Sequence, residues 1–179
     1  MRIHDTSLDP VKLIELDFRE DERGYFARLY CTDELTQAGI DHPVVQRNVS
    51  MSREAGTMRG IHYQRDEYAE SKFVTCIRGR IFDVAVDMRP ESPTYLQWAG
   101  FELDDTSLRS VFVPAGFAHG YLTLTDDAIA SYSVSTPYHP AAEVGFRFDD
   151  PAVGIDWPIT PNVVSEKDQA WPPLVDPRG

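Results

Sequence analysis

Lysine is scarce in this sequence, which narrows the kinds of ligand that the protein could bind. Only Lys12, Lys72 and Lys167 are present, and the formal net charge is −12 at pH 7. A nucleic-acid-binding domain needs a basic surface, so we expect no nucleic-acid partner. A phosphorylated small molecule needs only a local group of cations. The arginines between Arg53 and Arg80 could supply such a group, although scattered surface arginines would give the same pattern.

Cysteines and long apolar runs are also rare or absent. Cys31 and Cys76 are the only cysteines and form no C-x-x-C pair, so we expect two reduced thiols and no disulfide framework. No run of 18 apolar residues occurs, and the opening residues M-R-I-H-D lack the apolar core of a signal peptide. These absences predict a protein with no membrane partner, located in the cytoplasm.

The chain is dominated by short segments that are typical of β-strands. Its 179 residues suit one domain over 1–179, and hydrophobic residues make up 42% of it, enough for a sizeable core. One helix is predicted over 32–39, with Thr32 as N-cap and Gly39 as its stop. A polar turn is expected at 20–24, and an irregular, Pro-rich tail from Asp149. We expect strands at 11–17, 25–31, 44–52, 58–64, 72–77, 81–88, 96–103, 110–113, 119–124, 128–134 and 144–148.

Many short strands with regular turns predict an all-β fold in which two sheets form a sandwich or barrel, with one or a few short helices. A jelly roll of this kind leaves a cavity between its sheets, lined by alternate residues of each strand. In the segment 44–52, Gln46, Asn48 and Ser50 share one face, which suggests a wet, ligand-binding interior. A strand with one solvent face is the simpler interpretation of this segment alone.

Two local motifs resemble the two halves of the cupin signature. They are G-T-M-R-G-I-H-Y-Q at 56–64 and P-A-G-F-A-H-G at 114–120. In metal cupins the first half carries a second histidine, where this sequence has Gln64, a much poorer ligand for a transition metal. A site made by His62, Glu67 or Glu70, and His119 remains a less favoured alternative, so the motifs predict a cupin jelly roll without a metal.

Longer stretches of the chain make the resemblance specific. In order along nearly the whole chain, eight segments resemble the dTDP-4-dehydrorhamnose 3,5-epimerase family. They are D-E-R-G-Y-F (21–26), V-Q-R-N-V-S (45–50), G-T-M-R-G-I-H-Y-Q (56–64), S-K-F-V (71–74), F-D-V-A-V-D-M-R-P-E-S-P-T (82–94), V-P-A-G-F-A-H-G-Y (113–121), D-D-P-A-V-G-I-D-W-P (149–158) and S-E-K-D (165–168). The resemblance implies a cupin jelly roll, a homodimer, and an enzyme that needs neither a metal nor an organic cofactor.

The resemblance also implies roles for individual residues. His62 matches the general base, Asp168 its carboxylate partner, Tyr132 the acid on the opposite face of the sugar, and Lys72 the cation near the enolate oxygen. The positions matched to contacts with the nucleotide or sugar are Arg23, Phe26, Arg28, Gln46, Asn48, Arg59, His119, Tyr138, Glu143 and Lys167.

The chemistry of epimerisation requires such a set. A ketone at carbon 4 acidifies the hydrogens on carbons 3 and 5, and inversion needs a base and an acid on opposite sides of the ring. Imidazole is a natural base, since its reference pKa is about 6.5, and a fixed cation stabilises the enolate. Each residue also has an ordinary structural interpretation: Tyr132 as a core aromatic, Lys72 as a snorkelling surface residue, and Asp168 as a solvated carboxylate.

One feature of this set conflicts with regular strand geometry. Arg59 and His62 are three residues apart, so in an ideal strand they would point to opposite faces, although the resemblance needs both in one site. A bulge or twist at Gly60 would bring them to the same side.

Arg28 departs from the family pattern, which has a glutamate that helps to hold thymine from the neighbouring subunit. Arginine only donates hydrogen bonds, so it suits the acceptor edge of cytosine, and a CDP-sugar substrate becomes an alternative. Arg28 could instead bind phosphate. Ser133, where lysine is common, is a second departure. The sequence is also compatible with an enzyme acting only at carbon 3, with a metal-dependent cupin enzyme and with a non-catalytic sugar-binding cupin.

Overall fold

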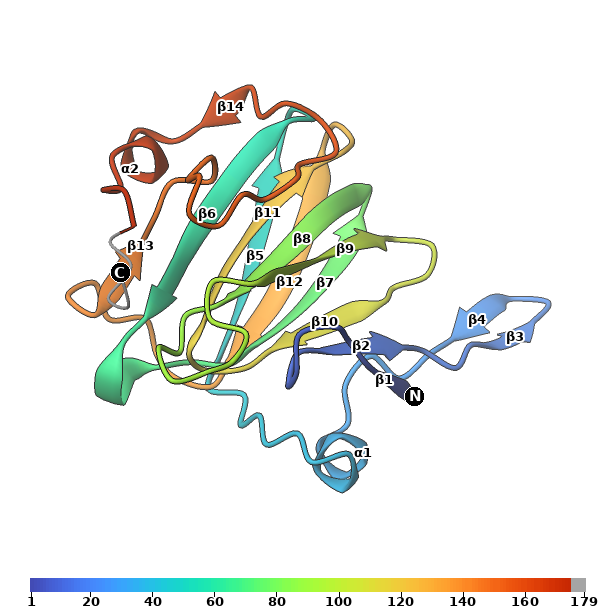
Figure 1. Cartoon of the computed structure of the whole chain (residues 1–179). Coiled ribbons are helices and arrows are strands. Elements are labelled where there is room, and N and C mark those ends of the chain that lie inside the picture. The colour runs from blue at the N-terminus through green and yellow to red at the C-terminus, as the bar shows by residue number, and fades with distance from the viewer. Residues whose placement is uncertain (175–179) are drawn as a thin grey trace.

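Two β-sheets packed face to face form the body of the protein, which confirms the predicted all-β double-sheet fold (Figure 1). The structure is a computed structural model, and it describes residues 1–174. The elements are β1 (Arg2–Asp5), β2 (Lys12–Glu15), β3 (Arg19–Asp21), β4 (Gly24–Phe26), α1 (Thr32–Gln37), β5 (Gln46–Ser52), β6 (Thr57–Gln64), the 3-10 helix η1 (Asp66–Tyr68), β7 (Lys72–Arg78), β8 (Arg80–Asp87), β9 (Trp98–Asp104), β10 (Ser110–Val113), β11 (Phe117–Thr123), β12 (Ala128–Val134), β13 (Glu143–Gly145), β14 (Val163–Val164) and α2 (Glu166–Gln169).

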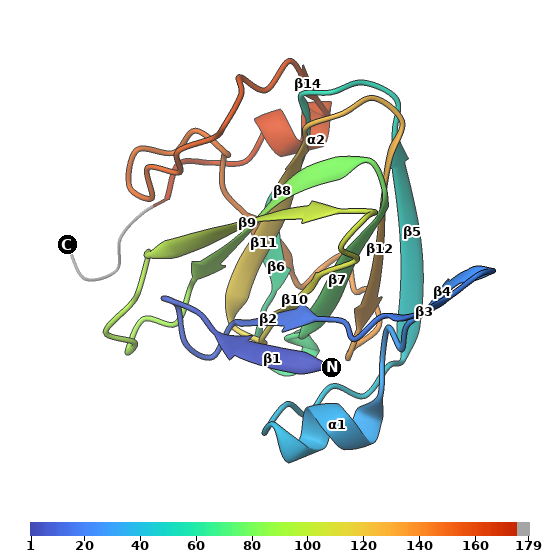
Figure 2. The same ribbon diagram turned by 90° about the vertical axis from the view of Figure 1, so that its right-hand side faces the viewer.

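The strands are shared between two sheets and one separate hairpin. Sheet I has the order β1-β2-β10-β7-β12-β5, and sheet II has the order β13-β6-β11-β8-β9, with β14 parallel to β6 at its side. The hairpin formed by β3 and β4 belongs to neither sheet and extends away from the sandwich (Figures 1 and 2). The edge strand β5 and the central strand β6 therefore belong to different sheets, although they follow one another in the chain.

Apolar residues fill three layers, because strand side chains alternate between the two faces of a sheet. Between the sheets, residues such as Val74 of sheet I pack with Ala85 and Phe117 of sheet II. On the outer face of sheet I, Leu35 of α1 joins a second cluster. On the outer face of sheet II, the C-terminal segment 146–174 covers a third cluster that includes Val84.

Three local predictions were wrong. Thr32 is already the first helical residue of α1, so it is not the N-cap. The N-cap is Cys31, whose backbone is extended (φ −152°) and whose side chain forms no capping hydrogen bond. The strand predicted over 25–31 ends at Phe26, as β4, and forms a hairpin with β3. Strand β3 includes residues 20 and 21, which were predicted to belong to the turn at 20–24. The tail is not wholly irregular, since β14 and α2 lie within it; its last residues, 175–179, are outside the described residues.

The predicted irregularity at Gly60 is present. On β11, His119 pairs with His62 and Tyr121 pairs with Arg59, so β6 has one more residue than β11 over the same stretch. Gly60 has φ +106°, and a Cβ there would lie 2.7 Å from Gly120 Cα, so only glycine fits this close approach. Arg59 and His62 consequently both line the same cavity.

No helix within residues 1–174 is long and apolar enough to cross a membrane.

Candidate active site

A cavity of about 600 Å³ lies between the two sheets. Sheet I contributes residues of β5, β7 and β12 to its wall, and sheet II contributes residues of β6 and β11, while the segment that contains α2 closes one side. Of the residues predicted to form the site, those that line the cavity are Gln46, Asn48, Arg59, His62, Lys72, His119, Tyr132, Tyr138, Glu143, Lys167 and Asp168. The cavity is therefore the candidate active site.

Strand alternation explains why polar side chains reach this interior. Gln46, Asn48 and Ser50 alternate along β5 and all three line the cavity, while Val49 between them is exposed on the outer face. The Gln46 side-chain amide donates to Asn48 Oδ1 at 2.8 Å. The wet interior suggested by the sequence is thus present along β5.

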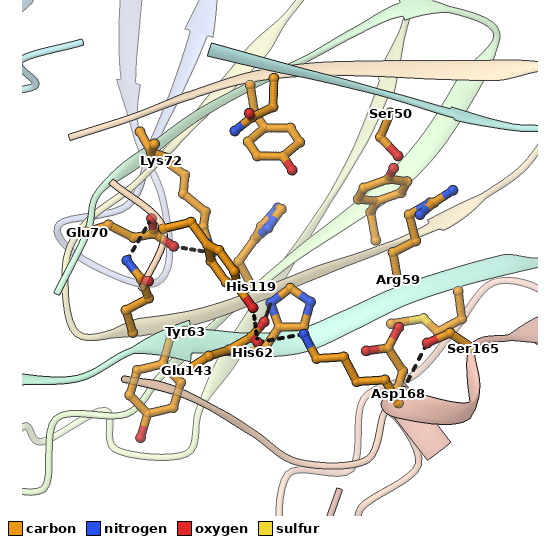
Figure 3. Close-up of a pocket in the computed structure, with 18 of the residues that line it drawn as sticks. Ser50, Arg59, His62, Tyr63, Glu70, Lys72, His119, Glu143, Ser165 and Asp168 are labelled. Atoms are coloured by element: carbon orange, nitrogen blue, oxygen red, sulfur yellow. Dashed lines mark hydrogen bonds and ion pairs between the residues drawn. The ribbon is translucent and has the colours of Figure 1, made fainter. Parts of the chain in front are cut away.

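His62 lies on β6 in the part of the cavity shown in Figure 3. Burial is the largest effect on the pKa of His62 and lowers it below the ordinary 6.5. The nearby Lys72 cation lowers this pKa further, whereas the Glu143 carboxylate raises it. The ring is therefore neutral at neutral pH and can accept a proton.

Glu143 is the carboxylate that makes an ion-pair contact with His62, at 3.7 Å between Oε1 and Nδ1. Its other oxygen, Oε2, accepts from Lys167 Nζ at 2.5 Å and from Tyr138 Oη at 2.8 Å. Burial alone would raise the pKa of Glu143, but the bonds from Lys167 and Tyr138 lower it below its ordinary value. Glu143 is thus an ionised group beside the candidate base.

His119 is held by a buried carboxylate that the sequence predictions did not include. His119 Nε2 lies 2.8 Å from Asp83 Oδ2, and Asp83 is fully buried. Asp83 shares strand parity with Ile81 and Ala85 on β8, which face the core. A carboxylate on the apolar face of a strand is a signal that could have identified it, since Asp is almost never fully buried unless paired.

Lys72 is buried and makes an ion pair with Glu70, at 3.1 Å between Nζ and Oε1. Gln64 Nε2 donates to the other oxygen of Glu70 at 3.2 Å, and also to the backbone carbonyls of Tyr68 and Pro137. Gln64 therefore holds the Glu70 carboxylate in place, and Glu70 in turn holds the Lys72 ammonium. Gln64 occupies the position of a metal ligand in other cupins but has a different task here.

The residues present do not fit the alternative metal site. Within the part of the chain that the structure describes, no group of three or more His, Cys, Asp or Glu side chains is arranged to hold a metal ion. Of the proposed ligands, Glu70 is engaged by Lys72, and His119 Nε2 is engaged by Asp83.

Tyr132 faces the cavity from β12 of sheet I, which pairs with β5 and β7. It is half-buried beside Ala130, a small residue of the same face that packs in the core between the sheets. Burial raises the pKa of its hydroxyl above the ordinary value, with Glu70 adding to the effect and Arg59 opposing it. The phenol is therefore protonated at neutral pH and can donate a proton.

Asp168 reaches the cavity on α2, which the sequence predictions missed. Ser165 caps this helix, because its side chain accepts a bond from the Asp168 backbone N–H at 3.1 Å. The spacing Ser-x-x-Asp is a known start signal for a helix and could have revealed it. The Asp168 side chain is buried in the cavity wall (Figure 3), but among residues 1–174 no hydrogen bond or ion pair joins it to His62.

Arg23, Phe26 and Arg28 do not line the cavity of their own chain. Arg23 is at the tip of the β3–β4 hairpin, where its side chain is paired with Asp21, and Phe26 is exposed on the same hairpin. Arg28 Nη1 donates to Glu34 Oε1 of α1 at 2.5 Å. The structure thus separates these three residues from the other predicted ones.

The chain is similar to proteins of one known family over nearly its whole length. The sequence model of the family described as dTDP-4-dehydrorhamnose 3,5-epimerase matches residues 5–176. A dTDP-4-dehydrorhamnose 3,5-epimerase of Methanothermobacter thermautotrophicus is 45% identical, over 94% of this chain and 92% of that protein. A dTDP-4-dehydrorhamnose 3-epimerase of Streptomyces niveus is 40% identical, over 94% of this chain and 82% of that protein.

A solved structure shows the same likeness in three dimensions. The dTDP-4-dehydrorhamnose 3,5-epimerase of Bacillus anthracis, with TDP and PPi bound, is 39% identical and superposes with a TM-score of 0.94, covering 97% of this chain and 99% of that one. Sequence and fold therefore agree over nearly the whole length of the chain. The chain belongs to the dTDP-4-dehydrorhamnose 3,5-epimerase family of isomerases.

Proposed function

We propose that the protein epimerises dTDP-4-dehydro-6-deoxyglucose at carbons 3 and 5 to give dTDP-4-dehydrorhamnose, without a metal or an organic cofactor. One observation carries this proposal: a neutral imidazole on sheet II and a protonated phenol on sheet I face the same cavity. A sugar ring between the sheets would have the base on one side and the acid on the other. Inversion at a carbon needs this opposed arrangement.

In the proposed reaction, His62 removes the hydrogen from the carbon next to the ketone. The C–H electron pair forms the enolate C=C bond, and the negative charge collects on the oxygen at carbon 4. Lys72 supports this oxygen, because its ammonium is buried in the cavity wall and held in place by Glu70. A preorganised cation in a site that excludes water stabilises such a charge more strongly than a cation in water does.

Tyr132 then returns a proton to the opposite face of the same carbon. The transfer breaks the phenol O–H bond and forms the new C–H bond, and the ketone at carbon 4 re-forms. The imidazolium then gives its proton to water and the phenolate takes one from water before the next carbon is inverted. A carboxylate beside His62 stabilises the imidazolium formed in the first step; Glu143 is in contact with the ring, and Asp168 is the residue implied by the family. Each positioned acid or base typically contributes about 10² to 10⁴ in rate.

The nucleotide diphosphate needs cations and hydrogen-bond donors at the other end of the cavity. Arg59 of β6 lies near Ser52, and its exposed guanidinium is available to an anion. Gln46 and Asn48 line the cavity along β5, in the direction of Lys72. The TDP bound to the Bacillus anthracis relative supports a nucleotide of this kind. We assign these residues to the diphosphate and the adjoining sugar.

We further propose that the active enzyme is a homodimer. On the outer face of β5, Val49 and Met51 are exposed by 66% and 46%, and Val45, directly before the strand, is exposed by 52%. Arg47 lies between Val45 and Val49 on the same face. Apolar side chains gathered on an edge strand are a frequent sign of an interface. The β3–β4 hairpin extends from the body of the chain, so in a dimer it could bring Arg23 and Phe26 to the partner's cavity (Figure 2).

The cysteines suit a reducing compartment. Cys31 and Cys76 are both free thiols. Disulfides persist mainly in oxidising compartments, whereas cytosolic proteins keep their thiols reduced. We therefore place the reaction in the cytoplasm as part of this proposal.

Proton NMR in heavy water tests the proposed function. We expect the wild-type protein to exchange solvent deuterium into dTDP-4-dehydro-6-deoxyglucose at carbons 3 and 5, with the same rate in the presence of a chelator. Exchange that stops with the chelator and returns with a divalent metal would contradict the metal-free mechanism. Exchange confined to carbon 3 would instead support the second candidate function, a 3-epimerase, which the Streptomyces niveus relative favours.

Two variants assign the base and the acid in the same experiment. His62→Ala removes the base, so deuterium exchange should stop at every carbon while dTDP still binds. Tyr132→Phe retains the base, so it should slow inversion more than proton removal. A Tyr132→Phe enzyme that inverts the sugar at the wild-type rate would show that Tyr132 is not the acid.

A further inference from the structure

Tyr121 has a hydroxyl group that lies in the wall of the cavity and has no partner. The residue lies on β11 and is 5% exposed, and its Oη is a buried polar atom without a hydrogen bond in the described structure. Buried tyrosine hydroxyls usually have a hydrogen-bond partner, so one without a partner needs an explanation. A ligand that fills the cavity would supply the missing acceptor.

The surroundings of Tyr121 identify the kind of acceptor. Tyr121 is the cross-strand partner of Arg59, and the Arg59 charge acts on the phenol. Arg59 Nε donates to Ser52 Oγ and Nη2 donates to the Met51 carbonyl, whereas Nη1 makes no hydrogen bond within residues 1–174. An anionic oxygen bound at the unused edge of this guanidinium would lie close to the Tyr121 hydroxyl.

The phenol is in the correct state to donate. Burial raises the pKa of Tyr121, against smaller opposing effects from Ser50 and Arg59, so the hydroxyl keeps its proton at neutral pH. The Ser50 and Ser52 hydroxyls lower this pKa, so they act on the phenol oxygen as donors, and neither forms a hydrogen bond of normal geometry with Oη. The proton of the phenol is therefore left without an acceptor among the described residues. In Figure 3, Ser50 and Arg59 lie on the side of the cavity away from Glu70 and Lys72.

We propose that Tyr121 is a substrate-binding residue, whose hydroxyl donates to a phosphoryl oxygen of the nucleotide diphosphate that Arg59 holds. This inference rests on the proposed function and adds a contact that its residue assignments do not contain. Tyr121 belongs to sheet II, the same sheet as His62. A proton donor for inversion has to be on the side opposite the base, so Tyr121 binds the diphosphate and leaves the donation of the proton to Tyr132.

The test compares dTDP with thymidine, which lacks the phosphates, by calorimetric titration of wild type and Tyr121→Phe. A hydrogen bond to a charged group is worth about ten- to a hundred-fold in affinity. We expect Tyr121→Phe to weaken dTDP by such a factor and to leave thymidine unchanged. Tyr68→Phe is the matched control, because Tyr68 stacks on His139 and does not line the cavity; it should bind both ligands as the wild type does.

The other outcomes separate this inference from the proposed function. Equal dTDP affinity in wild type and Tyr121→Phe would overturn the phosphate contact, while deuterium exchange by the wild-type enzyme would leave the proposed function standing. An equal loss for dTDP and thymidine, in a variant with an unchanged melting temperature, would also overturn it, since the hydroxyl would then act on the nucleoside or on the shape of the cavity.

Discussion

His62 has to be neutral to accept a proton, and Tyr132 has to be protonated to donate one. Burial and Lys72 lower the pKa of His62 below 6.5, so activity should be lost only as the pH falls through that lowered pKa. Burial raises the pKa of Tyr132 above 10.0, so the alkaline loss should come only above that value. We therefore expect kcat/KM to be constant between about pH 6.5 and pH 10, as measured from initial rates across this range.

Glu143→Gln provides the control for this pH profile. The Glu143 carboxylate raises the pKa of His62, so its removal should move the acid limb to lower pH without moving the alkaline limb. Assaying every sample at neutral pH after exposure to the test pH detects irreversible unfolding. An acid limb at or above pH 6.5 in the wild type, or a limb that does not move in Glu143→Gln, would contradict the electrostatics described for His62.

Sequence patterns predicted which side chains line the cavity better than they predicted the contacts between those side chains. The two cupin-like motifs predicted that His62 and His119 face the cavity. Alternation along β5 allowed the same for Gln46, Asn48 and Ser50, although a strand with one solvent face is the simpler interpretation of that segment alone. These patterns could not show that Gln64 fixes Glu70, because that contact depends on the path of the irregular connection between β6 and β7. Nor could they show that Glu143 is the carboxylate in contact with His62, because that contact joins two strands far apart in the chain. Such contacts depend on strand register and on rotamers, which local patterns do not determine.

At the scale of elements, His42 connects β7 and β12, the two strands that carry Lys72 and Tyr132, for which we propose catalytic roles. Its Nδ1 lies 2.7 Å from Ser71 Oγ and its Nε2 lies 3.0 Å from Ser133 Oγ. Ser71 precedes Lys72 at the start of β7, and Ser133 follows Tyr132 on β12. Neighbouring strand residues point to opposite faces, so His42 fastens the outer side of the sheet where Lys72 and Tyr132 face the cavity.

Removal of this connection should reduce stability. His42→Ala leaves a cavity beside Phe73 and Phe112 and two buried serine hydroxyls without partners, which should cost about 2–4 kcal/mol in the free energy of unfolding. Denaturant unfolding measures this loss, and kcat should fall with it because Lys72 and Tyr132 lose their alignment. His4→Ala, at an exposed histidine paired with Glu15, should change stability by less than about 0.5 kcal/mol. Equal effects of the two variants would refute a role for His42 in joining the strands.

The elements that the sequence predicted well are those in which one pattern dominates. The segments 110–113 and 128–134 coincide with β10 and β12, because both are short apolar runs with turn residues at their ends. The strand prediction failed at 27–31, where packing against the rest of the molecule prevailed over the local apolar pattern. The residues 27–31 are apolar enough for a strand, but they continue from the projecting hairpin to α1, where Ala27, Leu29 and Tyr30 pack against the cluster on sheet I.

At the scale of the whole molecule, the apolar outer face of β5 is exposed in a single chain, which is unfavourable unless a second chain covers it. Val49→Asp places a charge in the middle of this face, where Val49 is 66% exposed in the single chain. If the face is buried in a dimer, the charge would be desolvated at a cost of several kcal/mol. We expect the variant to be monomeric by light scattering at micromolar concentration, while the wild type is dimeric.

Ile159→Asp is the matched control for the dimer prediction. Ile159 is also apolar and 42% exposed, but it lies in the C-terminal segment at sheet II. We expect it to leave the dimer intact. A wild-type protein that is monomeric at micromolar concentration would contradict the proposed assembly, and a Val49→Asp protein that remains dimeric would place the interface elsewhere.

The dimer also determines how Arg28 can act on the nucleotide base. In the single chain Arg28 is paired with Glu34 of α1, and Glu34 in turn accepts from the N-terminal ammonium at 2.7 Å, so the guanidinium lies outside the cavity. Access to a base would have to come through the partner's cavity, near which the hairpin would lie. Thymine presents an N–H that a carboxylate can accept, whereas a guanidinium only donates and suits cytosine.

Arg28→Glu should therefore increase the preference for dTDP over CDP. A mispaired buried donor costs about ten- to a hundred-fold in affinity, which sets the expected change in the ratio of the two dissociation constants. Competitive binding of dTDP and CDP to both proteins measures this ratio. Glu34→Gln is the control, because it weakens the ion pair with α1 but keeps the guanidinium, so the ratio should stay at the wild-type value. If wild type already prefers dTDP a hundred-fold and Arg28→Glu leaves the ratio unchanged, Arg28 does not contact the base, and its ion pair with Glu34 is its role.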